Sequence, residues 1–123
     1  MLPIVPVQLQ APNGEKTIRV CGTIDTMCNR SVFPIQLAEY LEMDIADASK
    51  VNISLLNQTV ESRLLPAQIS LLGYDNQINA TLGVSVVNFI SQSPVVLLGM
   101  DFLSYFQMVF IAHEKIFVLQ RYC

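Results

Sequence analysis

The hydrophobic and polar positions of the chain alternate with a period of two over several short stretches. Such alternation places successive side chains on opposite faces of a strand, which predicts a mostly β protein. The clearest stretches are 51–55, part of 65–71, and 78–86, and they are preceded by an extended stretch over 4–9 and by the apolar positions of 18–20. Two turn signals separate them, Asn13-Gly14 after the first stretch and the run from Gly73 to Asn76 before the last.

Proline and glycine positions refine this pattern. Pro3 and Pro6 predict that the first strand is an edge or irregular strand, because proline donates no ladder hydrogen bond. Pro34 suits the first turn of a helix, and we expect one over 34–41. A shorter helix is expected over 99–106, followed by a last hairpin whose strands are 108–112 and 116–119. Residues 1–123 are expected to form a single domain.

The composition points to an oligomer. Of the 123 residues, 52% are hydrophobic and only 14% are charged, which is more apolar surface than a domain of this size readily buries. Association with a second copy would cover the excess. The formal net charge is −3 and the basic residues are scattered, so we expect no nucleic-acid partner.

Cysteine usage and the apolar runs bear on the compartment. Cys21, Cys28 and Cys123 cannot all pair within one chain and have no metal-ligand spacing, so we expect reduced thiols and no metal or other cofactor. The N-terminus lacks a basic segment followed by an apolar one, and the apolar runs are too short to span a bilayer. The expectation is an intracellular, cytoplasmic protein without a membrane partner.

One stretch places a carboxylate among apolar residues. The run from Arg19 to Phe33 reads as a strand that ends at Ile24, followed by Asp25, Thr26 and a turn. Burying a lone carboxylate is costly unless its charge is shared or solvated. Taken alone, Asp25 is most simply a turn-initiating aspartate at a strand end, which is the common use of this residue.

A second stretch changes that interpretation. Downstream the chain reads Pro94-Val95-Val96-Leu97-Leu98-Gly99-Met100-Asp101-Phe102-Leu103. Together with Ile24-Asp25-Thr26 and Ser31-Val32-Phe33, it resembles the paired signatures of retropepsin-like aspartic proteases, in the right order and over nearly the whole chain. Those signatures are an apolar pair with Asp-Thr-Gly-Ala, and Leu-Gly-x-Asp-x-Leu. The resemblance is strongest to the retrotransposon-derived and ubiquitin-shuttle branch.

The resemblance implies a fold and a mechanism. The fold would be a retropepsin-like closed β-barrel, the acid-protease fold, with one or two short helices and one lobe per chain. Asp25 would be catalytic, and a C2 homodimer would bring it opposite its copy. Two like charges about 3 Å apart cannot both ionise, so the pair shares one proton and divides the roles of acid and base. The substrate would be a peptide or protein.

The resemblance also assigns supporting residues. Thr26 would hydrogen-bond across the dyad, and Met27 and Cys28 would complete the active-site loop. Leu56, Asn57, Gln58 and Thr59 would occupy the place of the flap that closes over substrate. The first strand and the C-terminal residues up to Tyr122 would contribute to an intersubunit sheet.

One residue departs from the family pattern, because Met27 stands where the family has glycine. A methionine there would project into substrate space, although its flexibility makes it easier to accommodate than other large residues. Two hypotheses therefore stand: a homodimeric aspartic endopeptidase, and a catalytically impaired dimerisation or protein-interaction module. An unrelated small β-barrel would require both motifs to match by chance.

Other candidate groups have weaker support. A cysteine protease would need His113, the only histidine, to reach Cys28, and the spacing of the two residues does not indicate this. Asp101 stands at the start of a predicted helix, where a carboxylate suits the helix dipole, so we interpret it as structural.

Overall fold

The structure, a computed structural model, describes residues 4–55, 58–72, 80–87, 96–114 and 116–121. The strands in these ranges are β1 (Ile4–Gln10), β2 (Thr17–Ile24), β3 (Val32–Pro34), β4 (Ser49–Leu55), β5 (Gln58–Leu71), β6 (Ala80–Val87), β7 (Val96–Leu98), β8 (Phe106–Ile111) and β9 (Ile116–Arg121). The helices are α1 (Ile35–Tyr40), α2 (Met100–Leu103) and the 3-10 turn η1 (Ala112–Glu114). The prediction of a mostly β fold with two short helices is confirmed.

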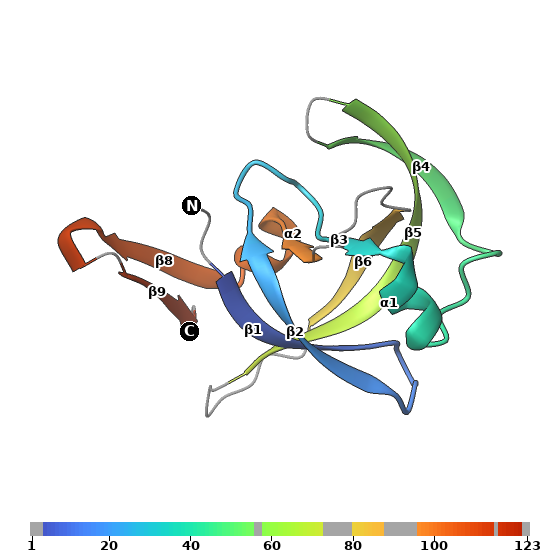
Figure 1. Cartoon of the computed structure of the whole chain (residues 1–123), viewed down its shortest axis with the longest axis horizontal. Coiled ribbons are helices and arrows are strands. Elements are labelled where there is room, and N and C mark those ends of the chain that lie inside the picture. Colours follow the sequence, from blue (N-terminus) through green and yellow to red (C-terminus); the bar gives the residue numbers. More distant parts are fainter. Residues whose placement is uncertain (1–3, 56–57, 73–79, 88–95, 115, 122–123) are drawn as a thin grey trace.

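Seven of the strands form one sheet that closes on itself. Their order is β1-β2-β7-β3-β6-β5-β4, and β1 pairs with β5 as well as with β2. The ring therefore runs from β1 through β2, β7, β3, β6 and β5 back to β1, and β4 lies outside it against β5 (Figure 1). Two of the pairings, β2 with β7 and β3 with β6, are parallel, so they join segments far apart in sequence.

The first hairpin forms where the sequence predicts it. The turn between β1 and β2 places Asn13 at a φ of 59°, a left-handed conformation that asparagine tolerates better than most residues. Val5, Val7 and Leu9 alternate inward along β1 with exposed or half-buried neighbours. The period-two pattern therefore marks the face of β1 that packs into the core.

The edge assignment of β1 is wrong for its second half. Residues Val7–Gln10 pair with β5 on one side and with β2 on the other. Pro6 lies just before the β5 pairing begins, and its carbonyl accepts the N–H of Leu72 at 3.1 Å. Pro6 has no backbone N–H to donate, and pairing with β5 does not require a donor at this position.

The core fills the interior of the ring with side chains from β1, β2, β3, β5, β6, β7 and both α-helices. The largest fully buried apolar side chains are Phe33, Phe102, Leu9, Ile24, Ile69, Leu98, Val7 and Val84. α1 covers this core through Ala38, the C-cap residue Leu41 is buried beside it, and α2 contributes Phe102 and Leu103. The rings of Phe102 and Phe106 meet edge to face, with their centroids 5.2 Å apart.

Helix α1 ends without the glycine that usually caps such helices. Glu42 adopts a φ of 58°, and its N–H donates to the Glu39 carbonyl at 3.1 Å. The N–H of Met43 donates to the Ala38 carbonyl at 3.0 Å. This pair of bonds is a Schellman motif, with a glutamate in the position that favours glycine. Glu42 also pairs with Lys16 at 3.2 Å across two exposed side chains.

Strands β4, β5 and β6 match the predicted β-rich segment, and β5 is longer than its alternation indicates. The β4–β5 register pairs Leu55 with Gln58, so these strands form the hairpin expected at the flap position. Residues 56–57 of that hairpin and the predicted turn from Gly73 to Asn76 lie outside the described residues.

The last hairpin, β8–β9, forms a separate two-stranded sheet. It leaves the body of the ring after α2, on the side where β1 begins (Figure 1). Its six-residue register pairs Phe106 with Arg121 and Ile111 with Ile116, around the predicted turn at His113. In the described part of the chain, neither α1 nor α2 has the length or apolar character needed to cross a membrane.

Candidate active site

Asp25 follows β2 directly and contacts the second signature. The parallel pairing of β2 with β7 places Ile24 beside Leu98. The next backbone N–H, that of Asp25, donates to the Leu98 carbonyl at 3.0 Å. The two motifs, far apart in sequence, therefore meet at one end of the ring.

The Asp25 carboxylate is half-buried and accepts two hydrogen bonds from its own loop. The backbone N–H of Met27 donates to Oδ1 at 3.0 Å, and the Cys28 thiol donates to Oδ2 at 3.2 Å. The Cys28 N–H also donates to the Asp25 carbonyl at 3.3 Å, which closes a tight turn. These donors fix the orientation of the carboxylate while solvent still reaches it.

Thr26 and Met27 lie at the outer surface of this turn. Thr26 is exposed, and the Met27 side chain is 92% exposed. Among the described non-glycine residues, only Asn13 and Glu42 have a positive φ, so the backbone conformation at Met27 does not itself require glycine. Within one chain, methionine at this position is accommodated without strain.

The Cys28 thiol sits between the Asp25 carboxylate and the interior. Burial and then the hydrogen bond to Asp25 raise its pKa from 9.0 to about 11, with smaller contributions from the charges of Asp25 and Asp101. The thiol is therefore protonated at neutral pH and is a poor nucleophile. His113 lies on the exposed 3-10 turn of the β8–β9 hairpin and faces Glu114 at 3.6 Å. These features disfavour the cysteine-protease interpretation.

Asp101 secures the other end of the same loop. Its two carboxylate oxygens accept the Ser31 N–H at 3.0 and 2.9 Å, and Oδ1 accepts the Ser31 hydroxyl at 2.8 Å. The hydroxyl in turn accepts the Gly99 N–H at 3.1 Å. Oδ1 also accepts the N–H of Phe102, which is in the first turn of α2. The structure thus gives Asp101 a structural role, although its main partner is Ser31 rather than the helix dipole.

Gly99 allows the two motifs to approach this closely. A Cβ at this position would lie 2.6 Å from the carbonyl carbon and oxygen of Arg30 and 2.8 Å from the Cys28 carbonyl oxygen. These are backbone atoms that cannot rotate away, so the contact requires glycine. Two further backbone bonds tie the loop to α2, from Met100 N–H to the Cys28 carbonyl and from Asp101 N–H to the Asn29 carbonyl.

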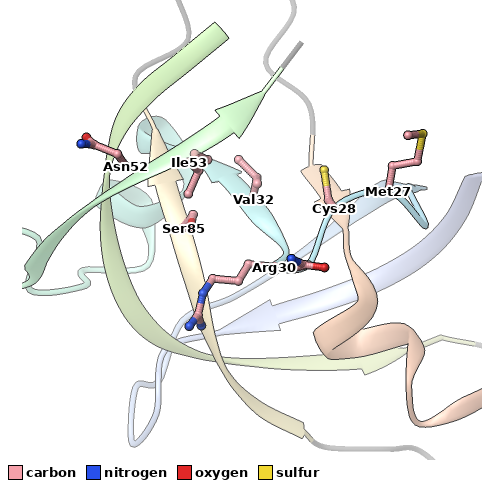
Figure 2. Close-up of a pocket in the computed structure, with 8 residues that line it drawn as sticks. Met27, Cys28, Arg30, Val32, Asn52, Ile53 and Ser85 are labelled. Atoms are coloured by element: carbon pink, nitrogen blue, oxygen red, sulfur yellow. The ribbon is translucent and has the colours of Figure 1, made fainter. Parts of the chain in front are cut away.

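A cavity of about 330 Å³ opens beside this loop. It is lined by Met27, Cys28, Asn29, Arg30, Val32, Asn52, Ile53 and Ser85 (Figure 2). These residues come from the active-site loop, β3, β4 and β6, so the walls of the cavity join three strands to the loop. A volume of this size lies at the lower end of the range for ligand pockets.

The predicted flap residues are only partly described. Leu56 and Asn57 lie outside the described residues, and Gln58 and Thr59 begin β5. Asn52 and Ile53 of β4, which sequence reasoning did not single out, are the residues of this hairpin that line the cavity. Ser85 was also missed, because a serine within an alternating strand gives no sequence signal of its own.

The donor groups near the cavity do not form a metal centre. In the described ranges, three or more histidine, cysteine, aspartate or glutamate side chains do not gather in any arrangement suited to a metal ion. Asp25 and Cys28 instead contact each other directly.

Comparison with known proteins identifies the fold. No model of a known protein family matches the chain, and no curated protein matches it. Among solved structures, EIAV protease complexed with the inhibitor HBY-793 is similar at a TM-score of 0.60 and 20% identity, over 85% of this chain and 86% of that one. A retropepsin-like aspartic protease from Rickettsia conorii is similar at a TM-score of 0.58 and 12% identity, over 94% and 81%.

A third solved structure extends this similarity over the whole chain. The retroviral protease-like domain of Ddi1 from Leishmania major is similar at a TM-score of 0.52 and 13% identity, over 100% of this chain and 97% of that one. The ring of six strands, the paired motifs at one end of it and these three likenesses agree, and the chain has the fold of the retropepsin-like aspartic proteases.

Proposed function

We propose that this chain is one half of a homodimeric aspartic endopeptidase. The observation that carries the proposal is the geometry of Asp25. Its half-buried carboxylate is oriented by the Met27 N–H and the Cys28 thiol, and it stands beside a cavity suited to a peptide side chain. A carboxylate that is held in one orientation and is open to solvent on one side could act as an acid–base group together with a second carboxylate.

The second carboxylate of the mechanism would come from a second copy of the chain. The chain carries one Asp-Thr motif, and peptide hydrolysis of this type needs two acids that share a proton. One carboxylate would take a proton from a bound water as that water attacks the peptide carbonyl. The other would donate its proton to the carbonyl oxygen. As the C–N bond of the intermediate breaks, the first carboxylate would pass the proton taken from water to the nitrogen, and the second would recover its proton from a hydroxyl of the intermediate.

The exposed apolar residues support this association. Met27, Met100 and Ile4 are 92%, 41% and 58% exposed. Met100 is tied to the Asp25 loop through the Cys28 carbonyl, and Ile4 pairs with Thr23, two residues before Asp25. Large apolar side chains gathered around one acidic loop are typical of an interaction surface. An isologous contact there would bring the two Asp25 side chains together.

The β8–β9 hairpin is the second candidate element for the interface. An isolated two-stranded hairpin is only marginally stable in water, so this one needs a partner surface. We propose that it and β1 contribute to an intersubunit sheet. Deletion of residues 117–123 should then lower the dimer content in sedimentation runs, whereas an unchanged dimer would place the interface elsewhere.

Met27 favours a second candidate function. Its exposed side chain lines the cavity, where glycine would leave the space open. A dimer that keeps Asp25 but fills the substrate path would act as a catalytically impaired interaction module that binds protein segments without cleaving them. Both candidates share the fold, the homodimer and the peptide-binding cavity, and they differ only in turnover.

One experiment distinguishes the two candidates. Wild-type protein and Asp25→Asn would be incubated with a diverse peptide library between pH 4 and 8, with products read by mass spectrometry and the native mass measured in parallel. Cleavage by dimeric wild type that Asp25→Asn abolishes supports the endopeptidase. Cleavage that survives in Asp25→Asn, or a wild type that is monomeric at micromolar concentration, contradicts it.

A further inference from the structure

Ser85 carries a buried hydroxyl for which the described structure gives no hydrogen-bond partner. The residue is 0% exposed, and its Oγ is the only buried side-chain N or O atom left unpaired in the described ranges. Its backbone is well satisfied, because the Ser85 N–H donates to the Ser31 carbonyl at 2.9 Å and β6 pairs with β3. A buried hydroxyl without a partner is unfavourable, so its presence needs an explanation.

The position of the hydroxyl suggests one. Ser85 lines the cavity beside the Asp25 loop, together with the cation of Arg30, whereas the amide of Asn52 points away from Ile53 and Val32 (Figure 2). Val32 and Ile53 form apolar walls between these polar groups. The lining includes no acidic residue, and neither Asp25 nor Asp101 belongs to it. In a chain of net charge −3, this cavity therefore combines a positive charge with a hydroxyl that can donate.

We propose that the cavity binds an acidic side chain of a peptide ligand, whose carboxylate accepts hydrogen bonds from the Ser85 hydroxyl and the Arg30 guanidinium. The inference rests on the proposed peptide-binding function and adds the chemical class of the side chain that the site selects. A guanidinium has five N–H donors in a planar fork, so it can serve a ligand carboxylate in addition to its contacts within the chain. The bond is charge-assisted, which favours a carboxylate over the neutral amide of the same shape.

The geometry also explains why the cavity would bind an acidic side chain in preference to an apolar or a basic one. The apolar walls of Val32 and Ile53 lower the exposure of a bound carboxylate to water, which strengthens its attraction to Arg30. The same walls offer an apolar side chain some contact, but that side chain would leave Ser85 unpaired. A basic side chain would face Arg30 as a like charge.

The test measures binding in the Asp25→Asn variant, in which no substrate is consumed. A fluorescent peptide panel places Asp, Asn, Glu, Gln or Leu at each position of an otherwise constant eight-residue frame, and anisotropy gives the affinities. We expect one position at which the acid binds about tenfold more tightly than its amide. Arg30→Gln should reduce this acid-to-amide ratio to near one. Lys50→Gln, which removes an exposed β4 cation outside the cavity, should leave the ratio unchanged.

Ser85→Ala gives an independent readout that does not depend on the peptide set. Because it removes an unpartnered buried hydroxyl, this substitution should raise the Tm of the free protein while weakening binding of the acidic peptide. A lower Tm would show that the hydroxyl has a structural partner, and it would overturn the inference. Arg30 is exposed, so we expect Arg30→Gln to fold. The affinity test therefore remains valid even if Ser85→Ala fails to fold.

The outcomes separate this inference from the proposed function. Acid-selective binding that depends on Arg30, without cleavage by the wild type, supports the inference and contradicts the endopeptidase. Cleavage by the wild type without acid selectivity supports the endopeptidase and overturns the inference. An acid preference that persists in Arg30→Gln, or no peptide binding at all, overturns it as well.

Discussion

The Asp101 carboxylate accepts both the backbone N–H and the hydroxyl of Ser31, a residue seventy positions away in sequence, at 2.8 to 3.0 Å. Ser31 closes the loop that begins at Asp25, and Asp101 is the second residue of α2, which begins at Met100 directly after Gly99. This contact holds the loop that carries the acid against the second motif. Its removal should therefore disturb both folding and the orientation of Asp25.

Asp101→Asn should lower the free energy of unfolding by about 1.5–3 kcal/mol, the usual contribution of hydrogen bonds to a charged group. The amide presents at most one acceptor oxygen to the several donors that the carboxylate satisfies. Urea unfolding followed by circular dichroism measures the loss. Ser104→Ala is the matched control, because its hydroxyl makes only an exposed 3.3 Å contact with the Asp101 carbonyl. Equal losses in the two variants would contradict the role of Asp101.

Gly99→Ala should destabilise the chain by about 2–3 kcal/mol, because the added methyl meets the backbone of residues 28–30 rather than a movable side chain. Differential scanning calorimetry gives the loss directly. Gly14→Ala is the control, since its nearest atoms are those of Ala11 at 3.1 Å in a surface turn. A Gly99→Ala protein as stable as Gly14→Ala would contradict the prediction, because it would show that the backbone of residues 28–30 moves to make room for the methyl at little cost.

Glu42→Gly should stabilise the protein by about 0.5–1 kcal/mol. Glycine adopts the left-handed conformation at the end of α1 without the steric cost of a Cβ, and this gain is partly offset by its greater freedom in the unfolded chain. The lost pair with Lys16 joins two exposed side chains and contributes little. Glu42→Ala removes the same pair but keeps the Cβ, so it serves as the control in thermal unfolding. A Glu42→Gly protein less stable than Glu42→Ala would refute the prediction.

The Cys28 thiol should react slowly with iodoacetamide at pH 8. A pKa raised from 9.0 to about 11 reduces the thiolate fraction at that pH about a hundredfold. The measurement uses the Cys21→Ser/Cys123→Ser variant, so that Cys28 is the only thiol. Adding Asp25→Ala removes the hydrogen bond and one of the charges, and the rate of the iodoacetamide reaction should rise.

The raised pKa of Cys28 also makes the stability of the protein depend on pH. Because the pKa is higher in the folded state, the thiol contributes stability that is fully present below pH 9 and is lost as the pH rises toward about 11.

Met27→Gly tests whether the methionine side chain limits turnover. Because Met27 is 92% exposed in one chain, its removal should cost folding only about 0.5–1 kcal/mol, mainly through glycine's extra freedom in the unfolded chain. If the side chain fills substrate space, peptide cleavage should increase in the variant. The gain should vanish in Met27→Gly/Asp25→Asn, which cannot exchange the proton. A dimeric Met27→Gly that cleaves no peptide would favour the interaction module.

Short-range sequence patterns were sufficient to predict several elements of this fold. Alternation along β1, the Asn13-Gly14 turn and Pro34 before α1 each act over a few residues, so the sequence alone predicts the element. The motifs around Asp25 and Gly99 were also identified from the sequence, through their resemblance to the paired signatures of one protein family. The periodicity of the sequence thus predicted the elements, and the motif pair predicted the fold.

Tertiary structure alone decided the contacts that cross the ring. Ser31 meets Asp101 and Ser85 enters the cavity because β3, β6 and β7 pair in one register, and a serine contributes no pattern that predicts its neighbours. The double pairing of β1 likewise depends on β5 arriving from far along the chain, beyond the reach of any local rule on Pro6. Glu42 takes a left-handed conformation because helix capping and the packing of the partly buried Met43 against the core outweigh its own preference. Sequence specifies local conformation, whereas closure of the ring selects which side chains meet inside it.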